Sequence, residues 1–103
     1  MLAFSSKWKE AILGGTKDVT LRKWPTARVK VGTVYDVAVM GYPPTKFAKV
    51  LVTGLRRIKL GEIDDSIAKR DGAASASEVK GYWKKQGFGP DKEMWLVEFK
   101  LQG

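Results

Sequence analysis

The segment that most constrains the fold is EMWLVEFKL, at residues 93–101. Along it, large apolar side chains alternate with charged ones: Trp95, Val97, Phe99 and Leu101 against Glu98 and Lys100. Because successive side chains of a β-strand point to opposite faces, this alternation predicts a strand with one buried face. Two further segments, 33–40 (TVYDVAVM) and 46–58 (KFAKVLVTGLRRI), are rich in β-branched and aromatic residues and also predict strands.

Turn residues punctuate these strands. The sequence GYPP at 41–44 predicts the connection between the two central strands. Gly54 lies inside the second of them, which indicates a bulge or a bend at a barrel corner. A shorter strand is expected at 18–22, where Val19 and Leu21 share one face, and Pro25 closes it.

Three helices are expected between and before the strands. Ser5 and Ser6 can cap a first helix, which Gly14-Gly15 ends; its buried residues would be Trp8, Ala11 and Ile12, with Phe4 packed at its start. A short helix is expected at 64–70. Ser75 and Glu78 form the S-x-x-E pattern of a capping box, which opens a third helix with Val79, Tyr82 and Trp83 pointing inward.

Strands therefore outnumber helices, and no repeat, linker or low-complexity segment divides the chain. We predict one α+β domain over residues 1–103. The expected architecture is a small, partly open β-barrel of about five or six strands with two or three covering helices.

Composition excludes several kinds of chemistry. The chain has no cysteine and no histidine, which removes thiolate and imidazole ligands, nucleophiles and bases. The acidic residues show no clustered ligand spacing, so we expect no metal and no cofactor. No apolar run is long enough for a bilayer and no signal peptide is evident, so we expect no membrane partner and a cytoplasmic location. The net charge of +8 favours a polyanionic partner such as RNA or a nucleotide.

The stretch GGTKDVTLRKW, residues 14–24, concentrates polar groups that a plain surface strand does not need. If Val19 and Leu21 face the core, Thr20 and Arg22 share the opposite face, where we expect an exposed strand surface. Lys17 precedes the strand, so its long side chain can reach the face of Thr20. From the residues alone, two interpretations stay open: a converging site, or a solvated strand with solubilising charges.

The order of these residues resembles a known family signature. The pattern GxKxxTxR, here Gly15 to Arg22, is similar to that of the ASCH domain family. The similarity extends along nearly the whole chain, through the aromatic-led N-terminal helix, the KFAKVLV strand, the pair Asp71-Gly72 with its serine-capped helix, and the WLVEF strand. ASCH domains have a PUA-like fold, a β-barrel with a cleft lined by this motif. Members are linked to RNA, and one small single-domain group hydrolyses the N4-acyl amide of modified cytidines.

The resemblance implies roles for individual residues. Lys17 matches the family lysine, Thr20 the threonine and Arg22 the arginine. The acidic partner falls on Asp71, where relatives typically have a Glu-Gly pair. Aspartate is one methylene shorter than glutamate, so Glu62 and Glu78 remain alternatives for this position.

With no cysteine or histidine, the groups that the resemblance makes available for amide hydrolysis are threonine, lysine and a carboxylate. In this interpretation Lys17, Thr20 and Asp71 are catalytic, and Arg22 stabilises charge on the oxyanion or a phosphate. Phe4, Trp24 or Tyr42 would stack on a pyrimidine ring. The expected substrate is N4-acetylcytidine or a related N4-acylated cytosine nucleoside.

Two other functions use the same features. A cleft with basic residues can bind RNA without chemistry, and two basic groups stand out for this: Lys17, Arg22, Lys23, Arg28 and Lys30, and then Arg56, Arg57 and Lys59. A ribonuclease is the third candidate, although such enzymes commonly rely on histidine.

Overall fold

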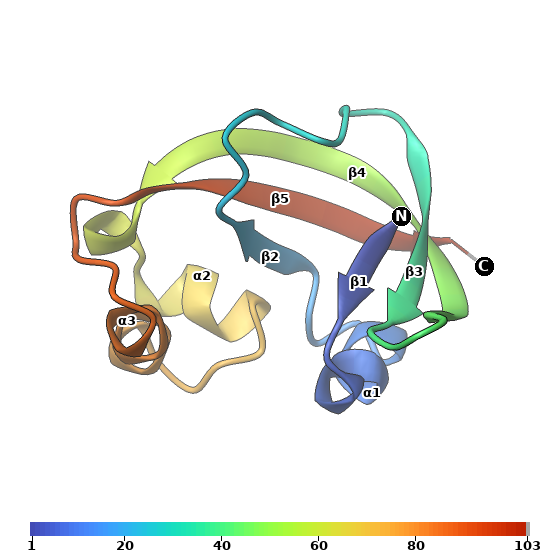
Figure 1. Ribbon diagram of the computed structural model, residues 1–103, viewed down its shortest axis with the longest axis horizontal. Coiled ribbons are helices and arrows are strands. Elements are labelled where there is room, and N and C mark those ends of the chain that lie inside the picture. The colour runs from blue at the N-terminus through green and yellow to red at the C-terminus, as the bar shows by residue number, and fades with distance from the viewer. Residues whose placement is uncertain (103) are drawn as a thin grey trace.

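The computed structural model describes residues 1–102 and shows a five-stranded mixed sheet curved into a half-barrel, with helices below its arch (Figure 1). The strands are β1 (Leu2–Phe4), β2 (Val19–Arg22), β3 (Val34–Val39), β4 (Thr45–Lys59) and β5 (Glu93–Gln102). The helices are α1 (Lys9–Leu13), α2 (Asp65–Arg70) and α3 (Ala76–Lys85), with 3-10 turns η1 (Ser6–Trp8) and η2 (Leu60–Glu62). The predicted α+β half-barrel is confirmed.

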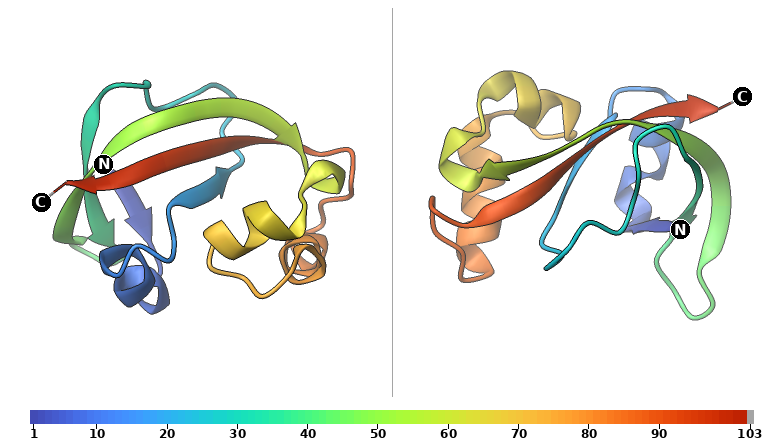
Figure 2. Two further views of the ribbon diagram at one scale, coloured as in Figure 1. Left: turned by 180° about the vertical axis from the view of Figure 1, so that it is seen from behind. Right: turned by 90° about the horizontal axis from the view of Figure 1, so that it is seen from above.

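The strand order is β1-β3-β4-β5-β2. β1 pairs with β3 in parallel, and all other pairs are antiparallel. The 15-residue β4 and the 10-residue β5 run side by side across the whole molecule, as both views of Figure 2 show. β3 pairs with β4 and β2 pairs with β5, so these two long strands form the centre of the sheet.

The sheet separates two apolar clusters, which we call the barrel core and the helical core. The barrel core lies between β1, α1, β3, β4 and β5; its buried members are Leu2, Phe4, Ile12, Val29, Val37, Val50, Val52, Val97 and Phe99. The helical core lies under α2 and α3; its buried members are Val19, Leu21, Ile58, Leu60, Ile63, Ala68, Val79, Met94 and Leu96. β5 serves both cores because its alternate residues point to opposite faces.

The bulge expected at Gly54 allows β4 to contribute buried residues to both cores as well. Its register against β5 shifts between Val52 and Gly54, which confirms the prediction. Val52 and Ile58 are an even number of residues apart and would share a face in a regular strand. One inserted residue reverses this, so Val52 enters the barrel core and Ile58 the helical core.

The N-terminal segment differs from the prediction. Residues 2–4 form strand β1, and Phe4 belongs to this strand rather than to the start of a helix. The helix is shorter than expected, and Ser5 makes no capping hydrogen bond with its side chain at the 3-10 turn η1. A three-residue strand shows too little alternation to be recognised; its pairing with β3 and the burial of Leu2 and Phe4 in the barrel core stabilise it.

The third helix begins where its cap predicts. The Ser75 hydroxyl accepts a hydrogen bond from the backbone N–H of Glu78 at 3.3 Å. Val79 is buried and Trp83 packs against the helical core, as expected. Tyr82 was predicted to point inward and does not: more than half of its side chain is exposed, because this helix covers the core with a single narrow stripe.

Gly72 ends α2 in a conformation that few other residues adopt. Its φ is +94°, the left-handed geometry typical of the residue that follows a helix cap. A Cβ atom at this position would lie 2.5 Å from Cζ3 of Trp8. The missing side chain therefore lets the Trp8 ring pack directly on the backbone after Asp71.

We predict that Gly72→Ala destabilises the fold by at least about 2 kcal/mol more than Gly87→Ala, measured by urea denaturation. Gly87 is the matched control, since its φ is +91° but a Cβ there meets nothing within 4 Å. Both substitutions strain the backbone, and only the first displaces Trp8. Equal losses of stability in the two variants would contradict the packing role of Gly72.

Candidate active site

Lys17 is fixed at the base of the site by the loop that joins α1 to β2. Gly15 turns the chain with a φ of +81°, and the backbone N–H of Lys17 donates to the carbonyl of Ala11 at 3.0 Å. These constraints send the side chain inward, where only 3% of the residue is exposed. A lysine this deeply buried is rare unless its charge is compensated.

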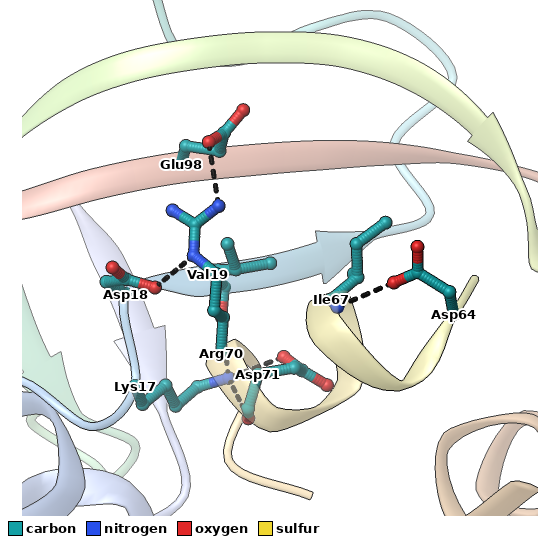
Figure 3. A network of polar contacts seen from close by, with 8 residues as sticks. All are labelled: Lys17, Asp18, Val19, Asp64, Ile67, Arg70, Asp71 and Glu98. Atoms are coloured by element: carbon teal, nitrogen blue, oxygen red, sulfur yellow. Dashed lines mark hydrogen bonds and ion pairs between the residues drawn. The ribbon is translucent and has the colours of Figure 1, made fainter. Parts of the chain in front are cut away.

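The Lys17 ammonium has three acceptors. Nζ donates to Oδ1 of Asp71 at 2.6 Å, to the backbone carbonyl of Asp71 at 2.7 Å and to the carbonyl of Val19 at 2.9 Å. An ammonium group has three N–H donors, so all of them are used. Of the three predicted acids, Asp71 is therefore the one that pairs with Lys17, and the shorter aspartate reaches it (Figure 3).

Aromatic rings complete the surroundings of the ammonium. Nζ of Lys17 lies 4.9 Å from the ring centroid of Trp8 and 5.7 Å from that of Phe4. These distances are within the range of cation–π attraction, which favours the charged form of the lysine. The sequence assigned Trp8 only to the core, since nothing in its spacing shows that Gly72 admits the ring to the site.

Asp71 caps the C-terminus of α2, and the segment that contains it is tied to the start of β2. The backbone N–H of Asp18 donates to the carbonyl of Arg70 at 3.0 Å. The Arg70 side chain returns the contact, with Nε 2.8 Å from Oδ1 of Asp18 and Nη1 3.1 Å from Oε2 of Glu98 on β5 (Figure 3). Arg70 thus joins α2, β2 and β5 beside the Lys17–Asp71 pair.

Burial brings the pKa values of Lys17 and Asp71 closer together. Desolvation lowers the pKa of Lys17 from its ordinary 10.5, although the Asp71 carboxylate opposes this shift. Desolvation likewise raises the pKa of Asp71 above its ordinary 3.8, against the opposing effect of Lys17. The pair is therefore better placed to exchange a proton than free lysine and aspartate.

Arg22 lies at the end of β2, half-buried. Its Nη2 donates to the carbonyl of Ala3 at 2.8 Å, and its Cζ lies 4.7 Å from the Phe4 ring and 5.9 Å from the Trp24 ring. Nε is buried without a hydrogen-bond partner among residues 1–102. Burial lowers the pKa of the guanidinium, which remains charged because arginine starts so high.

Thr20 departs from the prediction of an exposed strand site. Only 5% of the residue is exposed. Its neighbour across the ladder is Val97, a member of the barrel core, so both faces of β2 are covered. The alternation of Val19 and Leu21 identified the side of Thr20 correctly but did not show that distant segments close over it.

A cleft of about 710 Å³ brings these residues together, which is within the usual size of a small-molecule site. Its walls come from β1 and η1, from β2, and from the α2–α3 region. The cleft is lined by all the residues of the predicted site: Phe4, Lys17, Thr20, Arg22, Trp24 and Asp71.

The remaining candidates lie differently. Glu78 lines the cleft from α3, although it is exposed. Glu62 has another role, because its Oε1 accepts from the backbone N–H of Lys59 at 2.9 Å. Tyr42 is fully exposed in the β3–β4 turn and is not among the described residues that line the cleft.

The residues of the first predicted basic group differ in their exposure. Lys17 is buried and Arg22 half-buried, while Lys23, Arg28 and Lys30 are exposed. In the second group, Arg57 pairs with Glu93 at 3.5 Å. Within residues 1–102 there is no cluster of metal-ligating side chains, and no helix there is long and apolar enough to cross a membrane.

Comparisons with known proteins place this geometry on a known fold. No family model and no curated protein sequence matches the chain. Among solved structures, an ASCH domain from Lactobacillus crispatus JV V101 superposes with a TM-score of 0.65 at 15% identity, covering 89% of this chain and 68% of that one. Protein EF3133 from Enterococcus faecalis V583, described by the family model DUF984, gives 0.70 at 14% identity, with 92% and 69% covered.

A third structure, the hypothetical protein PH0355, matches over nearly its full length. The TM-score is 0.70 at 16% identity, with 98% of this chain and 96% of that chain covered. Identities this low show the fold alone. The chain has the fold of an ASCH domain, and the resemblance seen in its sequence is confirmed at that level.

We predict that Arg70→Gln lowers the free energy of unfolding by about 1 kcal/mol, since it removes two partly exposed ion pairs. The matched control is Lys69→Gln on the same helix, which removes an exposed charge from the neighbouring position. Urea denaturation of both variants checks this. A Lys69 variant that loses as much stability as the Arg70 variant would show that helix charge, rather than the ties to Asp18 and Glu98, is responsible.

Proposed function

We propose that the protein is an amidohydrolase that cleaves the N4-acyl amide of N4-acetylcytidine or a related N4-acylated cytosine nucleoside. One observation carries the proposal: a buried lysine–aspartate pair stands in a cleft that a threonine and an arginine also line. Buried titratable groups with altered pKa values, gathered in a cleft, are typical of catalytic sites.

In the proposed reaction, the Thr20 hydroxyl attacks the acyl carbonyl and Lys17 receives its proton. Lys17 can do so only as a neutral amine, because its ammonium donates to three acceptors and has no lone pair. Burial lowers the pKa of Lys17, which favours the neutral amine, while the Asp71 carboxylate opposes this shift. A threonine hydroxyl is a weak nucleophile without such a base.

The remaining steps follow from the same groups. The C–N bond breaks as a proton passes from the Lys17–Asp71 pair to the leaving nitrogen, and the acyl group stays on Thr20 Oγ1 as an ester. Water then cleaves this ester, which releases the carboxylic acid and returns the proton to Thr20. The positive guanidinium of Arg22 suits the stabilisation of the negative oxygen formed in both attacks.

We give Phe4 and Trp24 different roles: Phe4 holds Arg22 in place, and Trp24 stacks on the substrate base. Phe4 is 4% exposed and lies against the Arg22 guanidinium, so its position suits holding Arg22 in place rather than stacking on a base. Trp24 is half-buried in the cleft wall, and its carbonyl accepts from Nε1 of Trp95 at 3.1 Å. We assign the stacking role to Trp24.

RNA binding without chemistry is the competing function, and the exposed Lys23, Arg28 and Lys30 favour it. Salt separates the two. Affinity for single-stranded RNA should fall with a slope of about −0.7 per phosphate contact, whereas hydrolysis of a neutral nucleoside should hardly respond. Incubation with N4-acetylcytidine and detection of cytidine tests the hydrolase directly.

We predict that Thr20→Val and Lys17→Met each lower kcat for N4-acetylcytidine by at least about a hundredfold, since nucleophile and base act together. The double variant should lose little more than the worse single variant. Valine keeps the branched shape that the buried position requires and removes only the hydroxyl. Single-turnover and steady-state kinetics on the purified variants measure these losses.

Thr20→Ser is the matched control, because it keeps the hydroxyl and loses a buried methyl group. It should retain part of the activity while costing about 1 kcal/mol of stability. The Thr20→Val variant should show the reverse, with stability retained and activity lost. Losses that multiply in the double variant, or near-normal turnover by Thr20→Val, would refute the coupled pair.

We also predict that kcat/KM rises with pH through one ionisation whose pKa lies below 10.5, because Lys17 must be neutral and burial lowers its pKa. The Asp71 carboxylate raises the pKa of Lys17. In the activity that remains in Asp71→Asn, the rise of kcat/KM should therefore occur at lower pH. The Arg22 charge lowers the same pKa, so in Arg22→Gln the rise should occur at higher pH. Shifts in the opposite directions would exclude Lys17 as the titrating base.

A further inference from the structure

The positive charges of the cleft are not balanced within it. Four basic residues line it, and the two acidic ones are Asp71 and Glu78. Asp71 is engaged by the buried Lys17. Glu78 is therefore the single carboxylate facing three remaining cations, which are Lys7, Arg22 and Lys23.

These three cations also lack carboxylate partners of their own. Within the described chain, Lys7, Arg22 and Lys23 form no ion pair. On the sheet surface, by contrast, Lys46 and Lys49 both pair with Asp36, at 3.1 and 3.3 Å. The cleft lining therefore carries positive charge that no ion pair within residues 1–102 neutralises.

Lys7 and Lys23 approach the cleft from different walls. Lys7 lies in η1, after β1, with Nζ 4.8 Å from the Trp8 ring. Lys23 follows the last residue of β2, with Nζ 5.3 Å from the Phe88 ring. Both side chains are exposed, so aromatic contacts orient them while the ammonium groups keep free N–H donors.

A neutral nucleoside offers these cations hydrogen-bond acceptors but no negative charge. We propose that the substrate carries a phosphate group, recognised by Lys7 and Lys23 at the cleft, so that the preferred substrate is an N4-acylated cytidine nucleotide or the same nucleotide within RNA. This inference rests on the proposed function and narrows its substrate class. Phosphate supplies the oxygen acceptors and the negative charge that unpaired lysines attract.

The first experiment compares three substrates: N4-acetylcytidine, its 5′-monophosphate and a short oligoribonucleotide with one N4-acetylcytidine. At low salt, kcat/KM should be about tenfold higher for at least one phosphorylated substrate, mainly through KM, as two partly exposed ion pairs would give. The advantage should shrink at high salt, where exposed charges are screened. The monophosphate and the oligonucleotide show whether a terminal or an internal phosphate is read.

The charge variants give the second readout, the ratio of kcat/KM for the phosphorylated substrate to that for the nucleoside. The double variant Lys7→Gln/Lys23→Gln should bring this ratio close to one, and Glu78→Gln should increase it. The control Lys46→Gln/Lys100→Gln removes the same charge from exposed positions on β4 and β5 and should leave the ratio unchanged. An equal fall in the control would assign the preference to net charge and overturn the proposal.

A binding measurement separates this inference from the hydrolase itself. Calorimetric titration with cytidine and with cytidine 5′-monophosphate requires no turnover. Tighter binding of the monophosphate, lost in Lys7→Gln/Lys23→Gln, would support phosphate recognition even if no amide were cleaved. Efficient hydrolysis of the nucleoside with no preference for any phosphorylated form would overturn phosphate recognition and leave the hydrolase standing.

Discussion

The buried contact between Lys17 and Asp71 is the interaction on which the arrangement of the site depends. Their positions are 54 residues apart in the chain, and the ammonium binds both the carboxylate and the backbone carbonyl of the same aspartate. Breaking such a pair from one side leaves an uncompensated charge in a poorly solvated place, which is strongly destabilising. Conformations that separate Lys17 from Asp71 are therefore unfavourable, and this keeps the walls of the cleft together. Trp8 packs beside the pair on one side, and Arg70 ties the segment of Asp71 to β2 and β5 on the other.

Much of the architecture is readable in the sequence because its signals are local. The alternation in residues 93–101, the glycine inside the long strand and the serine before the third helix each identify a feature the structure contains. The same is true of the spacing of Lys17, Thr20 and Arg22, which lies within a single loop and strand. Asp71 became a candidate through the family resemblance, and the structure pairs it with Lys17.

What the sequence did not show depends on segments that meet only in the folded chain. Strand β1 exists because β3 lies beside it, and Thr20 is buried because the barrel core closes over a face that alternation alone marks as polar. Tyr82 and Val79 differ in burial although both are apolar residues of one helix, since the width of the stripe that the sheet covers is a tertiary property. Arg70 gave no signal because its partners Asp18 and Glu98 lie far along the chain.

The bulge at Gly54 has a consequence for how the molecule holds together. Because β4 and β5 each cross from one core to the other, neither core can melt while the other keeps its strands intact. Amide protons of both halves should thus exchange with solvent through one shared, global opening rather than through two separate ones. The cleft is walled by residues of both cores, so opening of either core would also disturb the cleft.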